Sequence, residues 1–447
     1  MIPRVEPNDP RRAALLYRRV AWRLVTFLFV CYVVNFIDRV NISFAKLQFL
    51  QSLQLSEAAY GLAAGMLFLG YTAFVIPGMK LVGVIGARRT MSLLMCAWGI
   101  CTVLLAFATT KHEFYLMRFF IGASEAAFAP CVILYLTYWF PHRLRGQMMS
   151  LFEISPTIAG IIGGPLAGWI LQNFGHGTSL EGWQWLFVLE GVPSVALGVM
   201  AWWWLAERPA NARWLSVDEA RFIAADVQAS LGTIARQSAS FMEVARDPRV
   251  YGFAYVYFAI FWCLNVFGTW TPTLLRSAGL TTPLEIGIYS SVISLVSAVG
   301  AYLMSLHSDR RLERFWHIVV GAALTIVAFV LLPMFPNSPF ASASVLCLGS
   351  VGIFTALSLF WTTPTICFAE HAARHALAIM ASLGSIGGFL SSTVTGWLKT
   401  QSGNLDSALG VAAIVLATGM IALRFVLPNT PREHAPLESV AAGPSPD

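Results

Sequence analysis

Long apolar stretches alternate with short polar ones along almost the whole chain. Each apolar stretch is about as long as the ~20 residues that a helix needs to cross a bilayer. None alternates apolar and polar residues in the manner of a strand, which excludes an outer-membrane β-barrel. We therefore expect an all-α membrane protein with twelve transmembrane helices. The predicted spans are 22–45, 58–80, 90–109, 113–140, 147–173, 184–205, 250–275, 284–306, 315–333, 340–368, 376–398 and 406–427.

A polar stretch after the sixth span divides the spans into two sets of six. Ser216 and Glu219 in this stretch have the spacing of a capping box, and Ser240 and Glu243 repeat it. We expect one or two short helices there, with a flexible tether as the alternative. The predicted segments are an N-terminal tail (1–19), a first six-helix bundle (20–205), a cytoplasmic linker (206–249), a second bundle (250–427) and a disordered C-terminal tail (428–447).

The two halves share a weak internal repeat. Gly160 and Gly168 in the fifth span have the same spacing as Gly388 and Gly396 in the eleventh, and a tryptophan follows the second glycine in both. Parallel repeats of six spans, with the site at their interface, are a known transporter design. We therefore expect two pseudo-symmetric bundles.

Composition and charge agree with a membrane protein whose linker and tails lie in the cytoplasm. The 447 residues are 57% hydrophobic and 12% charged, against about 25% charged in a soluble domain. Most Lys and Arg fall in the tails and alternate connections, which predicts a basic cytoplasmic side with both termini inside. We expect a bacterial inner-membrane protein that works as a monomer, and the positive charge gives no reason to expect nucleic acid. The basic residues assigned to the other side are Lys46, Lys111, Arg276 and Lys399.

Nothing in the sequence points to an enzyme or a metal site. The seven cysteines all fall in apolar runs without metal-ligand spacing. No nucleophile–His–acid set, phosphate-binding loop or HExxH motif occurs. We expect no cofactor, with the proton as the coupling ion.

Four charged residues inside two predicted spans are the main candidates for function. The first span contains Asp38 and Arg39, and the fourth contains Arg118 and Glu125. Counting ~1.5 Å per residue from opposite sides, Asp38 lies ~24 Å deep, Arg118 ~8 Å and Glu125 ~18 Å. Across a core of ~30 Å, Asp38 can pair with Arg118 and Arg39 with Glu125. Such residues are functional candidates by default; fixed salt bridges between two helices are the alternative.

The charged residues within the predicted spans are distributed unequally between the halves. The first half holds the titratable groups, so we expect it to handle protons, while the second half shapes the substrate site. A guanidinium stays charged in a dry site and grips a carboxylate through two hydrogen bonds, which favours Arg39 as the anion-binding group. Protonation of Glu125 would then free Arg39 for substrate. Further candidates for the substrate site are Tyr71, Asn265, Trp361, Thr362 and Ser385.

Several motifs together resemble the major facilitator superfamily, and within it the anion:cation symporter family of organic-acid transporters. They are Phe36-Ile37-Asp38-Arg39-Val40-Asn41, Gly86-Ala87-Arg88-Arg89, Arg118-Phe119-Phe120-Ile121-Gly122-Ala123-Ser124-Glu125, Tyr138-Trp139-Phe140-Pro141, Trp185-Leu186-Phe187-Val188-Leu189-Glu190-Gly191 and His307-Ser308-Asp309-Arg310-Arg311. The resemblance implies a twelve-helix secondary transporter that works by alternating access.

The same resemblance implies roles for individual residues. It makes Arg39 the substrate-binding arginine, Glu125 its acidic counterpart, and Asp38 with Arg118 the second pair. It places Arg88, Arg89, Asp309 and Arg310 in the motifs of the cytoplasmic gate. The chain departs from the family where it has Leu81-Val82 in place of an acid, and where Ser385 follows Leu383-Gly384 in place of Asn.

Together these observations predict proton-coupled uptake of a small organic carboxylate. A hydroxy-dicarboxylate such as tartrate, a sugar acid and an aromatic acid all stay open as substrates. The run Gly160–Gly168, with Pro165, resembles a motif of drug antiporters, so efflux of an anion or drug is the alternative; close helix packing also explains it. A membrane sensor without turnover is a weaker alternative. Glu153 and Glu190 have either a gate or a structural role.

Overall fold

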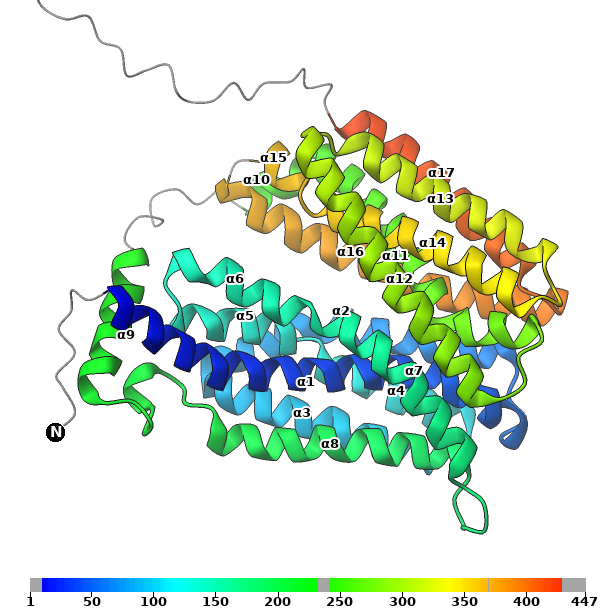
Figure 1. The fold of residues 1–447 in the computed structure, drawn as a ribbon, viewed down its shortest axis with the longest axis horizontal. Coiled ribbons are helices and arrows are strands. Elements are labelled where there is room, and N and C mark those ends of the chain that lie inside the picture. Colours follow the sequence, from blue (N-terminus) through cyan, green and yellow to red (C-terminus); the bar gives the residue numbers. More distant parts are fainter. Residues whose placement is uncertain (1–9, 232–240, 369, 428–447) are drawn as a thin grey trace, which may run out of the picture.

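The computed structural model describes residues 10–231, 241–368 and 370–427, and within these ranges the regular elements are helices (Figure 1). Twelve helical segments among the described residues are long and apolar enough to cross a membrane, which confirms the predicted spans. The capping candidate Ser240, residues 1–9 of the predicted N-terminal tail, and the predicted C-terminal tail lie outside the described residues.

Six of these segments come from each half of the chain. The first half contains α1 (Pro10–Ser52), α2 (Glu57–Ile85), α3 (Ala87–Leu105), α4 (Lys111–Glu125), α5 (Phe128–Trp139), α6 (His142–Glu153), α7 (Ser155–Asn173) and α8 (Gly182–Trp204). The linker carries α9 (Val217–Leu231) and α10 (Phe241–Arg246). The second half contains α11 (Pro248–Ser277), α12 (Pro283–Arg311), α13 (Phe315–Leu331), α14 (Pro339–Phe360), α15 (Pro364–Cys367), α16 (Glu370–Ser402) and α17 (Asp406–Val426).

Three spans that we predicted as single helices are broken. The breaks separate α4 from α5, α6 from α7, and α14 from α15. Pro130, Pro156 and Pro364 each follow a break by a few residues. Proline has no N–H to donate to the carbonyl four residues earlier, so that helical hydrogen bond is lost.

At two of these breaks a neighbouring hydroxyl replaces the missing donor. Ser155 Oγ donates to the Phe152 carbonyl at 2.7 Å, and Thr363 Oγ1 donates to the Phe360 carbonyl at 2.8 Å. Both carbonyls lie four residues before a proline, which cannot donate the usual helical N–H. A backbone carbonyl without a hydrogen-bond partner costs on the order of several kcal/mol inside a membrane, because it has lost its hydrogen bonds to water. The hydroxyl reduces this cost.

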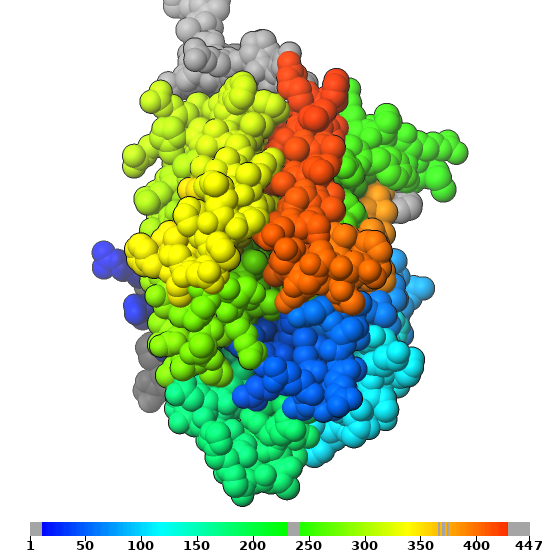
Figure 2. Space-filling model, turned by 90° about the vertical axis from the view of Figure 1, so that its right-hand side faces the viewer, coloured from blue at the N-terminus to red at the C-terminus, as the bar shows by residue number. Residues whose placement is uncertain are grey.

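The two halves meet at one end of the molecule and separate at the other. In Figure 1 the α7 and α12 ends lie together on the right, whereas α5 and α6 lie apart from α10 and α16 on the left. We call the end that carries α9 and α10 the linker end, and the opposite one the far end. Figure 2 faces the far end, where blue atoms near residue 50 lie against orange atoms near residue 400.

Two crossings of helices join the halves, and each uses glycine. At the crossing of α7 with α12, a Cβ on Gly164 would lie 2.6 Å from the Gly287 carbonyl oxygen. At the crossing of α2 with α16, a Cβ on Gly61 would lie 2.9 Å from the Gly396 Cα. Gly168 of the repeat likewise lies against the Pro283 carbonyl of α12, so the repeated glycines Gly168 and Gly396 lie at equivalent contacts between the halves. Any larger side chain at these positions would force the backbones apart.

The linker helix α9 packs on the first half. Its Asp226 accepts hydrogen bonds from Tyr17 of α1 at 2.8 Å and from Arg143 of α6 at 2.8 and 2.6 Å. The Arg143 guanidinium holds the pKa of Asp226 below its usual range. The Ser216–Glu219 capping box forms, with N–H to side-chain distances of 3.2 and 2.9 Å. This part of the linker is a docked helix.

Replacing Gly122 with Ala should destabilise the first half. A Cβ at this position would lie 1.9 Å from the Leu67 carbonyl oxygen, where α4 crosses α2. Overpacking of this kind costs about 1–3 kcal/mol, so the thermal unfolding midpoint of the purified protein should fall. Gly146→Ala on α6 is the control, because nothing lies within 4 Å of its would-be Cβ. Equal midpoints for the two variants would contradict this packing.

Candidate functional site

The centre of the candidate site is an ion pair between Arg39 of α1 and Glu125 of α4. Arg39 Nε donates to Glu125 Oε2 at 2.5 Å. The two side chains differ in access, since Arg39 is 22% exposed and Glu125 is 0% exposed. The second carboxylate oxygen of Glu125 is buried without a hydrogen bond to any described residue. The acid is therefore enclosed, while the guanidinium keeps a surface that a ligand can reach.

Aromatic rings flank the guanidinium. The Arg39 Cζ lies 4.9 Å from the centroid of the Phe36 ring and 5.4 Å from that of Tyr71. Contacts of a cation with ring faces stabilise it by about 0.5–2 kcal/mol, so these rings help to fix the guanidinium while it stays available. Tyr71, which we predicted as a substrate contact, is therefore a neighbour of Arg39.

Asp38 does not form the predicted pair with Arg118 in this conformation. Its Oδ2 accepts from Ser194 Oγ of α8 at 2.6 Å, and Oδ1 is buried without a partner among the described residues. Nε and Nη1 of Arg118 are likewise buried and unpaired within those ranges. The prediction rested on the depth of each residue along its helix, which is similar for the two. Depth contains no information on the rotation of each helix about its axis. Ser194 bonds to one oxygen of Asp38 instead, and no feature of the sequence indicated this serine.

More unpaired polar groups lie on the same side of α1. Asn35, Asp38 and Asn41 follow each other at three-residue spacing and are all buried. Glu190 of α8 is 4% exposed, and both of its oxygens lack a hydrogen-bond partner in the described part of the chain. An isolated ionised carboxylate is very costly in such surroundings. Because it is buried, Glu190 belongs to the core of the first half. Glu153, at the end of α6, is exposed.

Asn265 of α11, predicted as a substrate contact, is already bonded within the second half. Its amide donates to the Gly388 carbonyl at 3.0 Å and to Ser392 Oγ at 2.6 Å, and its oxygen accepts from Thr269 at 2.9 Å. These bonds tie α11 to α16. In this structure Asn265 is a bridge between helices of the second half.

The other predicted contacts of the second half lie in two places. Ser385 Oγ donates to carbonyls of its own helix and lies 3.3 Å from Thr72 Oγ1 of α2, at the boundary between the halves. Trp361 follows α14 and packs against Tyr257, with ring centroids 4.7 Å apart. Thr362 Oγ1 donates to the Leu359 carbonyl at 2.7 Å. Trp361 is the aromatic residue of this second-half set and is half-buried.

An acid that we did not select caps the motif of Arg88 and Arg89. Glu207, after α8, accepts from the N–H groups of Ala87 and Arg88 at 2.7 and 3.0 Å. A carboxylate at the N-terminus of α3 satisfies free donors and interacts favourably with the helix dipole. Glu207 thus supplies a negative charge at the loop whose usual acid is replaced by Leu81-Val82.

The equivalent motif of the second half lies at the end of α12. Asp309 pairs with Arg314 at 2.5 Å, and Arg310 is in the last turn of the same helix. Both motifs are at the linker end, where the halves are apart. Neither Asp309 nor the Arg88–Arg89 motif forms an ion pair across the halves among the described residues.

At the far end, an ion cluster does join the halves; we call Lys46, Glu57 and Lys399 the far-end latch. Lys46 of α1 and Lys399 of α16 approach the Glu57 carboxylate of α2 at 2.6 and 2.7 Å. Lys46 also donates to Thr273 Oγ1 of α11 at 2.9 Å, and its ammonium lies 4.0 Å from the Trp270 ring centroid. In the sequence, these lysines indicate only which side of the membrane each loop faces. A lysine inside an apolar run was the signal that could have found the latch.

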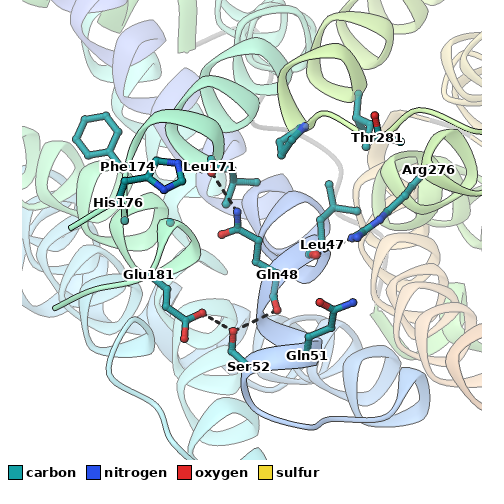
Figure 3. Close-up of a pocket in the computed structure, with 14 residues that line it drawn as sticks. Leu47, Gln48, Gln51, Ser52, Leu171, Phe174, His176, Glu181, Arg276 and Thr281 are labelled. Carbon is teal, nitrogen blue, oxygen red and sulfur yellow. Dashed lines mark hydrogen bonds between the residues drawn. The ribbon is translucent and has the colours of Figure 1, made fainter. Parts of the chain in front are cut away.

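A cavity of about 430 Å³ opens outside the latch, between the halves. Figure 3 shows Gln48, Gln51 and Ser52 of α1 facing Glu181 on one side and Arg276 on the other. Ser52 donates to Glu181. Arg276 Nη1 donates to the Leu47 carbonyl at 2.6 Å and so adds another link between the halves. Arg39 does not line this cavity, which is a far-end vestibule separate from the ion pair.

Comparison with protein families gives a match over most of the chain. The family described as Major Facilitator Superfamily matches residues 28–392. The chain is 35% identical to "Putative metabolite transport protein NicT" of Pseudomonas putida, over 89% of this chain and 91% of that protein. It is 34% identical to a "Putative tartrate transporter" of Agrobacterium vitis (92% and 91%) and 32% identical to a "Quinolone resistance transporter" of Acinetobacter baumannii (93% and 96%).

Solved structures agree on the fold. A bacterial homologue of the human lysosomal transporter Spinster, in an inward-facing and occupied conformation, aligns with a TM-score of 0.73 at 16% identity, covering 94% of this chain and 97% of that one. The xylose transporter XylE of Escherichia coli, in an inward open conformation, aligns with a TM-score of 0.71 at 14% identity, covering 92% and 98%.

Removing the charge of Glu57 should open the far end. Glu57→Gln leaves two lysines beside each other without a counter-charge, and each lost charge-assisted hydrogen bond removes about 1.5–3 kcal/mol. Spin labels on cysteines at Gln51 and Thr281, one on each half, should report longer distances in this variant, in a background without the native cysteines. Glu285→Gln is the control, since Glu285 is an exposed far-end acid outside the latch. Unchanged distances in Glu57→Gln would show that the latch does not hold the far end closed.

Proposed function

Because the chain belongs to the major facilitator superfamily, it is a transporter rather than an enzyme, and we propose that it takes up a small organic carboxylate together with protons. The observation that carries this proposal is the Arg39–Glu125 pair. A buried acid holds a partly accessible arginine of α1, and no other acid among the described residues is bonded to that arginine. This arrangement lets a proton and a carboxylate compete for the same two side chains.

The exchange of partners on Arg39 is the proposed coupling step. When Glu125 is ionised, it occupies Arg39. A proton on Glu125 removes the negative charge, and the carboxylate of the substrate then takes its place on the guanidinium with two hydrogen bonds. Loss of the proton restores the ion pair and expels the substrate. Binding and protonation are linked because neither charge is stable alone in an apolar bundle.

Asp38 and Arg118 are the proposed second element of coupling. Asp38 is buried and has one hydrogen bond, from Ser194. In a state where α1 and α4 rotate relative to each other, Arg118 can reach Asp38. Protonation of Asp38 would then decide whether these two helices lock together. This gives Arg118 a gating role and leaves substrate binding to Arg39.

We assign the linker end to the cytoplasm of a bacterial inner membrane, as the basic loops predict. The present conformation is then open to the cytoplasm and closed outside by the latch. Opening to the outside requires the halves to rock about the α7–α12 and α2–α16 crossings and the latch to break. A single chain contains both halves, so we expect the monomer to transport.

Efflux is a second candidate with a specific observation in its favour. The chain is similar to a relative named as a quinolone resistance transporter. In addition, α7 contains the glycine–proline run that resembles a motif of drug antiporters. In the structure Gly164 and Gly168 of this run lie against the backbone of α12, which accounts for the glycines through packing. Net uptake or net efflux of the same acid under a fixed proton gradient separates the two directions.

The Arg39→Lys variant tests the substrate site. Lysine keeps the charge but lacks the planar fork, so carboxylate binding should weaken by about tenfold or more. The measurement is uptake of organic acids into proteoliposomes under an imposed proton gradient, with Arg276→Lys as a control in the far-end vestibule. Wild-type affinity in Arg39→Lys would contradict the assignment of Arg39. Accumulation that ignores the gradient in the wild type would contradict proton coupling.

A further inference from the structure

Five aromatic rings form a cluster beside the Arg39 site, which we call the aromatic wall: Phe68, Tyr257, Phe261, Phe360 and Trp361. Tyr257 lies at its centre, with its ring centroid 4.7 Å from Trp361, 5.5 Å from Phe261 and 5.6 Å from Phe360. Phe360 is buried, whereas the other four rings are half-buried and keep accessible surface. The wall includes α2 of the first half and the second-half helices α11 and α14.

Glycines of α16 make room for these rings. A Cβ on Gly384 would lie 1.9 Å from the Tyr257 ring. A Cβ on Gly388 would lie 2.8 Å from the Phe261 ring and 2.9 Å from that of Phe68. No other residue fits at either position without moving a ring. The wall is therefore seated directly on the backbone of α16, which fixes its rings in place.

The wall lies beside the arginine through α16 and α2. Tyr257 packs on Gly384 of α16, and the next residue, Ser385, lies 3.3 Å from Thr72 Oγ1 of α2. Tyr71, which precedes Thr72, flanks the guanidinium together with Phe36. A ligand held by its carboxylate on Arg39 would thus have ring faces beside it on α1 and α2, with the wall next to them.

Most polar groups near the wall in the second half already form hydrogen bonds, chiefly within that half. Asn265 is bonded to α16, Ser385 bonds to its own helix and to Thr72, and Ser391 donates to the Trp262 carbonyl at 2.9 Å. The hydroxyls of Tyr71 and Tyr257 make no hydrogen bond with any residue in the described ranges. A polyhydroxylated acid would find few partners in the second half, and each hydroxyl left without one costs binding free energy.

We propose that the substrate is an aromatic monocarboxylate, with its carboxylate on Arg39 and its ring against Tyr257 and Trp361. This inference rests on the proposed carboxylate transport and chooses among the acids that the sequence leaves open. Aromatic rings stack on one another in offset or edge-on geometry with more stabilisation than apolar area alone provides. The free Tyr71 and Tyr257 hydroxyls suit one polar substituent on the ring.

The test measures the thermal stability of the purified full-length protein against four acids at rising concentration. The probes are benzoate, 4-hydroxybenzoate, cyclohexanecarboxylate and tartrate. The two aromatic acids should bind about three- to tenfold more tightly than cyclohexanecarboxylate, which has the same carboxylate on a saturated ring. Tartrate should bind more weakly than either aromatic acid.

Variants of one tyrosine identify the wall as the cause. Tyr257→Leu should lose the preference for benzoate over cyclohexanecarboxylate. Tyr257→Phe should keep that preference and lose only the one for 4-hydroxybenzoate over benzoate, so it tests the proposal even where the leucine variant fails to fold. Tyr255→Leu is the control on the same helix, because Tyr255 is exposed and lies near Thr418 of α17.

The outcomes separate this inference from the proposed function. Tartrate binding as tight as that of 4-hydroxybenzoate, or an aromatic preference that survives in Tyr257→Leu, would overturn the aromatic assignment and leave carboxylate transport standing. Absence of a response to all four acids, together with Arg39→Lys behaving as wild type in uptake, would overturn the proposed function itself.

Discussion

The placement of one ion pair in an apolar bundle constrains much of this structure. Arg39 and Glu125 are joined at 2.5 Å, and the acid has no exposed surface. Removing one partner of a buried pair costs about 3–5 kcal/mol because the other charge is left alone. The pair can therefore open only if the acid gains a proton or the arginine gains another anion. In the proposed coupling, the proton and the substrate each supply one of these two changes.

The contacts between the halves are arranged so that such a local change can affect the whole molecule. The α7–α12 and α2–α16 crossings bring backbones together at Gly164 and Gly61, close to the far end. The latch closes the same end with charges that face one another across the halves. The helix breaks provide further sites of local freedom, since α4 ends directly after Glu125. A change at Glu125 thus acts at the end of a helix segment, where the backbone is already interrupted.

The sequence predicted the larger features well. The apolar runs were long enough to identify twelve spans. The glycine pair of the fifth span, Gly160 and Gly168, and the matching pair of the eleventh, Gly388 and Gly396, marked both crossings. Depth along α1 and α4 was enough to pair Arg39 with Glu125. It could not pair Asp38 correctly, because the rotation of each helix about its axis depends on packing that depth does not describe.

Other features depended on distant parts of the chain. Glu207 caps α3 from the other end of the first half, and Lys46 meets Lys399 only after the halves assemble. Asn265 looked like a ligand contact because it is polar within an apolar span, yet its neighbours on α16 satisfy it. The aromatic wall was predicted from the sequence only at Trp361, since tyrosine and phenylalanine in a membrane helix are usually packing residues. Its position became evident from the glycines of α16 that it packs against.

The most direct test of this account is to count protons taken up when the purified protein binds its substrate in weakly buffered solution near neutral pH. If substrate replaces Glu125 on Arg39, wild-type protein should take up close to one proton per carboxylate bound. Glu125→Gln should bind the same acid and take up none through this residue. Binding by the wild type without proton uptake, or the same uptake in Glu125→Gln, would contradict the exchange of partners on Arg39.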